Sequence, residues 1–383
     1  MKQGWEYKKL GEICNITMGQ SPDGKSINTN EGVEFHQGKT CFGERTLGVS
    51  SLFSNAPVKL AEAHSVLLCV RAPVGYPNIT NRKICIGRGL CALYAKEDID
   101  NTFLFYSLLG KQSHFEKNAT GSTFKAISSK VISNTEIPLP PKSTQLSIVS
   151  ELDKINELIR LKKEQLKDYD NLAQSIFYEM FGDPVENEKG WEVKKLSSLF
   201  KVSSSKRIMQ EEWAKEGVPF LKVSDIVSLI KYGKVSPSTF ISKLKFKKLE
   251  EAKMVPTVGD ILITSRGTLG LCYIIKTDDK FYFQDGMVTW LSENTGDIIP
   301  IYITYVFSNN HFLEILAGRA NKSTVSYISI KQISQKEITV PPLPLQHLFA
   351  QRIEQIERQK SAVQKSITDL ETLLASRMQY WFE

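Results

Sequence analysis

Two segments of the chain carry apolar residues at alternating spacings of three and four. They run from Ser143 to Met180 and from Leu345 to Phe382, each after a double proline, and good helix formers inside them fit the signals of a helix start. The apolar positions are Leu152, Ile155, Ile159, Leu166, Tyr169, Ala173, Ile176 and Met180 in the first segment, and Ile353, Ile356, Val363, Ile367, Leu370, Leu374 and Trp381 in the second. This pattern predicts two long helices that pack on each other through a coiled-coil seam.

Polar residues interrupt both predicted seams. They are Lys162 in the first helix and Lys360 and Arg377 in the second. Such breaks favour one register between the two helices. We read the double prolines, Pro140-Pro141 and Pro341-Pro342, as hinges between a domain and its helix.

An internal repeat organises the rest of the chain. Gly-Trp-Glu-Tyr-Lys-Lys-Leu at 4–10 returns as Gly-Trp-Glu-Val-Lys-Lys-Leu at 190–196, identical at six of seven positions after a shift of 186. Residues 66–75 and 261–270 both read as a buried strand that enters a turn with an arginine, and residues 119–141 match 320–342 at 12 of 23 positions after a shift of 201. The shift grows from 186 to 201, so the second copy has 15 more residues between the matched segments. The copies therefore share these segments and differ in the sequence between them.

The repeat divides the chain into four parts, 1–142, 143–184, 185–342 and 343–383. They are expected to be a globular domain, a spacer helix with its linker, a second globular domain and a second spacer helix. A pseudo-two-fold axis through the paired helices makes them antiparallel. The 35 residues from Leu146 to Met180 then span about 52 Å, comparable with about 15 base pairs of DNA.

Composition excludes several classes of protein. The chain has 383 residues, 41% of them hydrophobic and 24% charged, as in packed globular proteins. Apolar runs such as 66–70 are far too short to cross a bilayer, and the first residues lack the core of a signal peptide, so we expect a cytoplasmic protein without a membrane span. Six cysteines without CxxC spacing and five scattered histidines predict reduced thiols and no metal site.

Positive charge belongs to the two predicted domains. The net charge is +5 for residues 1–142 and +5 for 185–342, but −3 for 143–184 and 0 for 343–383. Lysine and arginine neutralise DNA phosphates without reading sequence, whereas arginine can read guanine and glutamine or asparagine can read adenine at base edges. The duplicated basic module therefore favours nucleic acid as the partner.

Candidate base readers should lie where the two copies differ. In the first copy these segments carry Lys25, Asn28, Asn30, Gln37, Lys39, Arg45, Asn81, Arg82, Lys83 and Arg88; in the second they carry Lys206, Arg207, Gln210 and 243–248 with Lys245 and Lys247. Alternatively, each of these residues is an ordinary solvated surface residue without a role in binding. Arg71 and Arg266 are shared by the copies, as are Ser122-Thr123 and Ser323-Thr324. A shared position favours a shared task, either phosphate contact or holding a loop in shape.

Catalytic motifs are absent from the sequence. It has no GxGxxG after a strand, no phosphate-binding GxxxxGK[ST] loop and no tetrad of the kind that amino-methyltransferases use beside a flipped base. Acid-x-Lys triplets at 6–8 and 192–194 are common by chance. We expect no catalytic residue, no metal and no cofactor in this chain.

Three features together resemble the specificity (S) subunit of Type I restriction-modification systems. They are the twice-used Gly-Trp-Glu-x-Lys-Lys-Leu opening, the strand followed by Arg-Gly-Thr-Leu-Gly at 266–270, and the double prolines before long helices. The first copy departs at 71–75, where only the arginine and the last glycine are kept. The resemblance covers essentially the whole chain.

The resemblance implies an α/β (α+β) protein with two target recognition domains joined by two long helices in an antiparallel coiled coil. Each domain would read one half of a bipartite, asymmetric site in double-stranded DNA, and the helices would set the gap. The partners implied are two modification (methyltransferase) subunits, which bind S-adenosylmethionine and methylate adenine, and restriction subunits that use ATP. The outer faces of the helices, near Lys163 and Gln364, are the expected docking surface for the modification subunits.

Two other functions remain open from sequence alone. The chain could be the recognition half of a different restriction or methylation enzyme. It could also be a coiled-coil scaffold whose basic ends meet acidic proteins.

Overall fold

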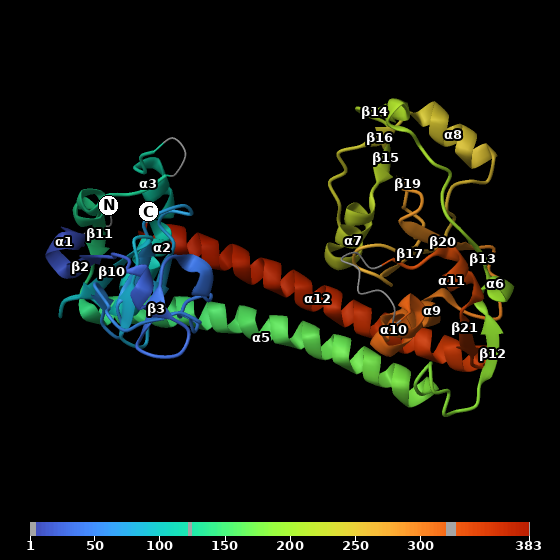
Figure 1. The fold of residues 1–383 in the computed structure, drawn as a ribbon, viewed down its shortest axis with the longest axis horizontal. Coiled ribbons are helices and arrows are strands. Elements are labelled where there is room, and N and C mark those ends of the chain that lie inside the picture. Colours follow the sequence, from blue (N-terminus) through green and yellow to red (C-terminus); the bar gives the residue numbers. More distant parts are fainter. Residues whose placement is uncertain (1–4, 122–124, 319–326, 383) are drawn as a thin grey trace. The chain divides into compact units, whose positions relative to one another are not determined.

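The computed structural model describes residues 5–121, 125–318 and 327–382, and its contacts divide the chain into two compact units (Figure 1). Unit 1 comprises Met1–Glu164 and Val363–Glu383, and unit 2 comprises Gln165–Ala362. Each unit therefore contains one copy of the repeat, part of the helix that follows it and part of the other long helix.

Three β-sheets form the globular part of unit 1. Strands β1 (Glu6–Lys9) and β11 (Glu136–Leu139) pair antiparallel, and a four-stranded sheet has the order β2-β10-β7-β8. Its strands are β2 (Cys14–Met18), β10 (Leu90–Ala95), β7 (Val66–Cys69) and β8 (Pro77–Ile79). A five-stranded sheet has the order β3-β5-β4-β9-β6, with β3 (Ile27–Asn28), β5 (Phe53–Ser54), β4 (Val33–His36), β9 (Ile84–Ile86) and β6 (Leu60–Ala61). Strand β7 is buried throughout, as its unbroken apolar run predicts.

Unit 2 repeats these sheets in the same order. Strands β12 (Glu192–Lys195) and β21 (Glu337–Val340) pair as β1 and β11 do, and β13-β20-β17-β18 and β14-β16-β15-β19 correspond to the larger sheets. The strands are β13 (Lys201–Ser203), β20 (Val288–Ser292), β17 (Ile261–Thr264), β18 (Cys272–Ile274), β14 (Trp213–Ala214), β16 (Phe240–Ile241), β15 (Val218–Leu221) and β19 (Tyr282–Phe283). The repeat predicted from sequence is thus a repeat of topology.

The two copies differ in the helices that fill this frame. Unit 2 has α7 (Val223–Tyr232) and α8 (Lys243–Glu251) between β15 and β17, where unit 1 has the 3-10 turn η2 (Lys39–Cys41), irregular loops and β6. The other short helices of unit 1 are α1 (Leu10–Ile13), α2 (Asn101–Gly110), α3 (Gln112–Lys117) and α4 (Ser129–Asn134); those of unit 2 are α6 (Leu196–Leu199), α9 (Pro300–Ser308), α10 (Asn310–Ala317) and α11 (Ile330–Gln335). Turns η1 (Gly24–Ser26) and η3 (Gln210–Glu212) complete the elements of the described residues.

The two predicted long helices are present as α5 (Lys142–Phe181) and α12 (Leu343–Phe382). In unit 1, Arg377 pairs with Glu151, and Lys163 Nζ lies 3.3 Å from Glu371 Oε1, so rising numbers in one helix meet falling numbers in the other. The helices therefore run antiparallel, as predicted. In unit 2 the polar break at Lys360 is occupied by an ion pair, with Nζ 2.8 Å from Asp170 Oδ1.

Aromatic residues at the helix ends extend the predicted seam into the two domain cores. Phe177, Phe181 and Phe349 are buried in the core of unit 2. Phe382 is buried in unit 1, with its ring centroid 5.5 Å from that of Phe103. The last turn of α12 is thus part of the core of the first copy.

A buried glutamine fixes each double-proline junction. Gln145 Nε2 donates to the carbonyl oxygens of Asp98 and Pro140, both at 2.9 Å, and its Oε1 accepts from the Asp100 N–H at 2.8 Å. Gln346 binds the corresponding groups of unit 2, with Nε2 3.1 Å from the Asp297 oxygen and 2.7 Å from the Pro341 oxygen. Both side chains are fully buried. The junctions that we read as hinges are therefore clamped by side-chain hydrogen bonds.

Replacing this glutamine by leucine should destabilise the protein strongly. Gln145→Leu leaves two buried carbonyl groups and one N–H without their partner, so we expect a loss of about 3 kcal/mol in the free energy of unfolding. Urea unfolding measures the change. Gln351→Leu, the same substitution on an exposed face of α12, is the control and should change stability by less than about 0.5 kcal/mol.

Candidate nucleic-acid interface

Loops from several strands of unit 1 meet at one edge of its two larger sheets. The Gln20 N–H donates to the Ile86 oxygen at 3.0 Å, the Gly87 N–H to the His36 oxygen at 2.7 Å, and the Val70 N–H to the Gly89 oxygen at 2.9 Å. Further bonds join Ile86 to the oxygen of Lys59 and Ile127 to the oxygen of Val70. We call this group, 19–21, 37–39, 59, 70–76, 87–89, 119–121 and 125–127, the Arg71 edge.

The Arg71 edge is basic and lacks acidic residues. Its segments contain no aspartate or glutamate, and they carry five cations, Lys39, Lys59, Arg71, Arg88 and Lys125. All five are exposed, and none forms an ion pair with another described residue. Lys39 Nζ lies 4.9 Å from the centre of the Tyr76 ring. Uncompensated positive charge on adjoining loops attracts a polyanion.

The corresponding edge of unit 2 has the same construction. The Gln284 N–H donates to the Leu221 oxygen, the Ser265 N–H to the Met287 oxygen and the Ile328 N–H to the Ser265 oxygen, each at 2.9 Å. We call this group, 204–207, 222, 265–270, 284–287 and 327–328, the Arg266 edge. Its cations are Lys206, Arg207, Lys222 and Arg266, and its single carboxylate, Asp285, lies 2.8 Å from Arg207 Nε.

The turn that carries the shared arginine closes in the same way in both copies. The Gly75 N–H donates to the Cys69 oxygen and the Gly270 N–H to the Thr264 oxygen, both at 2.8 Å. Both glycines have positive φ, +81° and +76°, and an added Cβ would lie 2.9 Å from Phe115 Cβ or 2.5 Å from Leu313 Cδ2. The two turns are closed by the same hydrogen bond although their backbones differ. The Ala72–Pro73 peptide is cis in the first turn, and Gly267 has a φ of 76° in the second.

The structure brings half of the candidate cations to these edges. Lys39, Arg71 and Arg88 lie at the Arg71 edge, and Lys206, Arg207 and Arg266 lie at the Arg266 edge. Lys25 is exposed on η1, while Lys245 pairs with Glu212 and Lys247 Nζ lies 4.0 Å from Glu251 on α8. The shared pairs Ser122-Thr123 and Ser323-Thr324 lie outside the described residues.

Arg82 is bound within the protein and is not free to contact DNA. Its Nε and Nη2 each lie 2.6 Å from a Glu34 oxygen, and Nη2 also donates to the Gly48 oxygen at 2.9 Å. Glu34 further accepts from the Ser50 N–H and contacts His36 Nε2 at 2.9 Å. Burial opposes ionisation of Glu34, but these bonds outweigh it and lower its pKa to about 2. Burial lowers the pKa of His36, which keeps the ring neutral near pH 7.

Removing the Glu34 charge should cost stability in a pH-dependent way. Glu34→Gln leaves Arg82 without its carboxylate, and we expect a loss of about 3 kcal/mol at pH 7. Because the pKa of folded Glu34 lies below its ordinary value of 4.5, its contribution is complete above pH 4.5 and disappears as the pH falls towards 2. The stability difference between wild type and variant should therefore shrink over that range. Chemical unfolding at pH 7, 5 and 3 measures it, and a constant difference would contradict the assignment.

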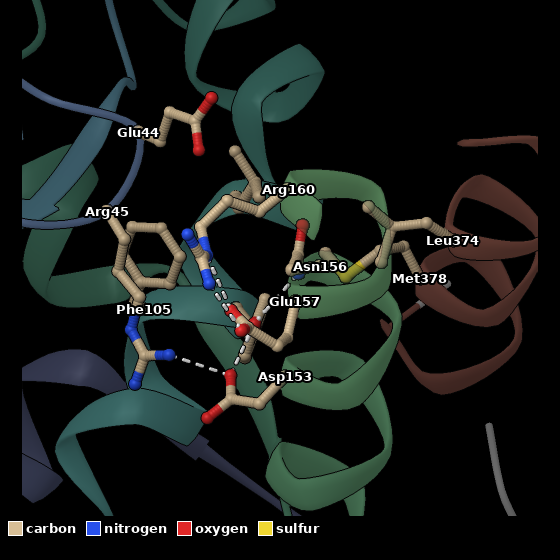
Figure 2. Close-up of a pocket in the computed structure, with 11 residues that line it drawn as sticks. Glu44, Arg45, Phe105, Asp153, Asn156, Glu157, Arg160, Leu374 and Met378 are labelled. Atoms are coloured by element: carbon tan, nitrogen blue, oxygen red, sulfur yellow. Dashed lines mark hydrogen bonds and ion pairs between the residues drawn. The ribbon is translucent and has the colours of Figure 1, made fainter. Parts of the chain in front are cut away.

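Arg45 is likewise held by the protein (Figure 2). Its Nη1 lies 2.7 Å from Asp153 Oδ1 on α5, and Nη2 donates to Thr102 Oγ1 at 3.0 Å. A cavity of about 400 Å³ beside this pair is lined from α2, α5 and α12 by residues that include Phe105, Asn156 and Met378. Lys83 pairs with Glu62 at 2.7 Å. Arg45, Arg82 and Lys83 belong to the sheet edge opposite Arg71, since Lys83 precedes β9 and Arg88 follows it.

Sequence reasoning missed several residues of the two edges. Lys59, Lys125 and Gln284 were not among the candidates, because none lies in a segment that the comparison of copies singled out. Lys222 ends the segment 203–222, in which the copies differ, but was not named as a candidate. A usable signal was nevertheless present for three of them, since Lys59, Lys222 and Gln284 each lie directly beside a strand end.

The structure offers no other kind of site among its described residues. Within 5–121, 125–318 and 327–382, no three His, Cys, Asp or Glu side chains are grouped so that they could hold a metal ion. None of the helices in these ranges combines the length and the apolar character of a bilayer span.

Comparison with protein families supports a specific class. A family model described as the Type I restriction modification DNA specificity domain matches residues 2–168 and again 188–372. The putative type I restriction enzyme MjaX specificity subunit of Methanocaldococcus jannaschii is 39% identical over 178 residues, which are 45% of this chain and 42% of that protein. The MjaIX specificity subunit of the same organism is 25% identical over 374 residues, or 90% of this chain and 85% of the relative.

Solved structures show the same fold. A chain from a study of complex assembly and conformational transition of the type I R-M system has a TM-score of 0.65 at 20% identity, covering 100% of this chain and 98% of the other. The S subunit of a Type I restriction-modification system from M. genitalium has a TM-score of 0.53 at 16% identity, with coverage of 100% and 98%.

Proposed function

This chain belongs to the Type I restriction-modification DNA specificity domain family, and we propose on that premise that it is the non-catalytic subunit that recognises DNA in such a system. Each copy of the repeat reads one half of a bipartite, asymmetric site in double-stranded DNA. The helices α5 and α12 set the gap between the halves. The relatives named as specificity subunits support this assignment.

The interface proposed for DNA is the pair of loop edges described above. The observation that carries this choice is the Arg71 edge, where five exposed cations lie on adjoining loops without one acidic residue. The Arg266 edge supports it, because its one carboxylate is paired with Arg207. We leave Arg45, Arg82, Lys83, Lys245 and Lys247 out of the proposed contact set, since each lies outside the two loop edges and has a carboxylate partner within the protein.

Catalysis is assigned to partner subunits. Two modification subunits would bind S-adenosylmethionine and methylate adenine, and restriction subunits would translocate and cut DNA with ATP in the cytoplasm. The outer faces of α5 and α12 are the proposed docking surface; Gln364 is exposed there, whereas Lys163, expected to face outward, is exposed but pairs with Glu371 of α12. Exposed leucines on α5, among them Leu158 and Leu161, support docking there because an apolar surface is favourable to cover.

Enrichment from random DNA tests the proposal. The full chain, assembled with the modification subunits of its system, is incubated with randomised duplexes and the bound DNA is sequenced. We expect two short, different half-sequences at one fixed gap. Binding without any enriched gapped motif would overturn the proposal and favour the scaffold alternative.

A further inference from the structure

The strand end and the facing loop of each edge are joined by the same hydrogen bonds in the two copies. Gln37 follows β4 and Lys222 follows β15, while the loop before β10 is Gly87-Arg88-Gly89 and the loop before β20 runs from Gln284 to Met287. The first residue of each of these loops donates to the residue before Gln37 or Lys222, at 2.7 Å for Gly87 to His36 and 2.9 Å for Gln284 to Leu221. The last residue of each loop, Gly89 or Met287, accepts from the N–H of the residue directly after β7 or β17. The same frame thus presents different side chains.

Each copy carries one amide and one cation on these two elements, and the element that carries the cation differs between the copies. The strand end carries Gln37 in the first copy and Lys222 in the second. The facing loop carries Arg88 as its second residue in the first copy and Gln284 as its first residue in the second. Arginine and lysine bind the O6 and N7 acceptors of guanine, and glutamine binds N6 and N7 of adenine. An exchange of this kind suits two half-sites that differ in sequence.

We propose that these two pairs are base readers. Arg88 reads guanine and Gln37 reads an adjacent adenine in the first half-site, while Lys222 reads guanine and Gln284 reads adenine in the second. The shared Arg71 and Arg266 contact phosphates, which carry no sequence information. This inference rests on the proposed function and names the residues that give it specificity.

The backbones of Gln37 and the Arg88 loop are in direct contact. A Cβ added at Gly89 would lie 2.2 Å from the Gln37 oxygen, and one added at Gly87 would lie 3.2 Å from the Gln37 Cα. Both side chains therefore leave from adjoining backbone, and both are exposed. Neighbouring base pairs are about 3.4 Å apart, so two side chains of this placement can address adjacent bases.

Buried groups hold this backbone in place. His36, which accepts from Gly87 and precedes Gln37, is only 2% exposed and is bonded to Glu34. Arg82 fixes Glu34 from the other side. In the second copy, Asp285 is adjacent to Gln284 and is paired with Arg207, so its charge is compensated where DNA would approach. Readers on a fixed backbone lose little conformational entropy when they bind.

Single substitutions separate the roles of the four residues. The full chain with its modification subunits is subjected to the same enrichment from randomised duplexes, and bases are counted at each position. Arg88→Ala should reduce the preference for guanine about tenfold at one position of one half-site, and Gln37→Ala should do so for adenine at the neighbouring position. Lys222→Ala and Gln284→Ala should act in the same way on the other half-site. Arg88→Gln should change the preferred base from guanine to adenine.

Lys83→Ala is the matched control, because Lys83 is an exposed cation of the first copy at the opposite sheet edge. It should leave both half-sequences unchanged, and thermal unfolding of every variant shows that the fold is kept. A wild type that enriches a gapped motif, together with variants that keep every base preference, would overturn the inference and leave the proposed function standing. A wild type that enriches no motif would remove both.

Discussion

Loss of both shared arginines should weaken DNA binding without changing the preferred sequence. Arg71 and Arg266 are exposed, have no ion-pair partner among the described residues, and follow the same closed turn in both copies. Each is assigned one phosphate contact. For Arg71→Ala with Arg266→Ala we expect an affinity loss on the order of 50-fold near 0.1 M salt, and a decrease of about 2 in the slope of log K against log salt.

Titration of a duplex that carries the wild-type site, at several salt concentrations, measures both quantities. The matched control is Lys9→Ala with Lys195→Ala, which removes the same number of exposed cations from another position that the copies share. It should leave the slope nearly unchanged, since these residues lie beside α1 and α6, away from the two loop edges. An altered half-sequence in the arginine variant would show that these residues read bases instead.

A heptad inserted into both long helices should lengthen the gap in the preferred DNA site. The natural insertion points are after Glu164 and after Ala362, where the contacts of each helix pass from one unit to the other. Seven residues add about 10 Å of helix, which corresponds to about three base pairs by rise alone. Seven residues also turn a straight helix by only about 20° from a whole number of turns, so the seam faces its partner as before.

Enrichment from randomised duplexes reads out the gap and the half-sequences together. We expect both half-sequences to be kept, with binding to the original site reduced strongly. An insertion into α5 alone is the control, because it breaks the ion-paired register with α12 and should reduce stability instead of redefining the site. A changed half-sequence at an unchanged gap would show that the helices do not set the spacing.

The architecture was predictable because repeats and apolar periodicity are properties of the sequence itself. The heptad-like positions of α5 and α12 and the matched segments around Arg71 and Arg266 predicted both long helices, their antiparallel packing and two copies of one frame. The clamps of Gln145 and Gln346 were not predicted, since a buried amide looks like any polar residue until the carbonyls that it binds are located.

Individual side chains of the interface were predicted less well. Arg45 and Arg82 resemble DNA-binding residues in sequence, but folding brings Asp153 and Glu34 beside them from distant segments. Lys59 and Lys125 became candidates only when backbone hydrogen bonds showed which loops share an edge. Charge in a sequence is local information, whereas its compensation depends on contacts between residues far apart in the chain.

The position of Phe382 bears on the order in which the molecule assembles during its synthesis. This side chain packs on Phe103, and a Cβ at Gly110 would lie 2.9 Å from its own Cβ, so the last turn completes the core around α2. The ribosome therefore makes every residue of the second unit before it releases the segment that closes the first. The first copy is translated earliest and reaches its final packing last, and it must remain unaggregated in the nascent chain until then.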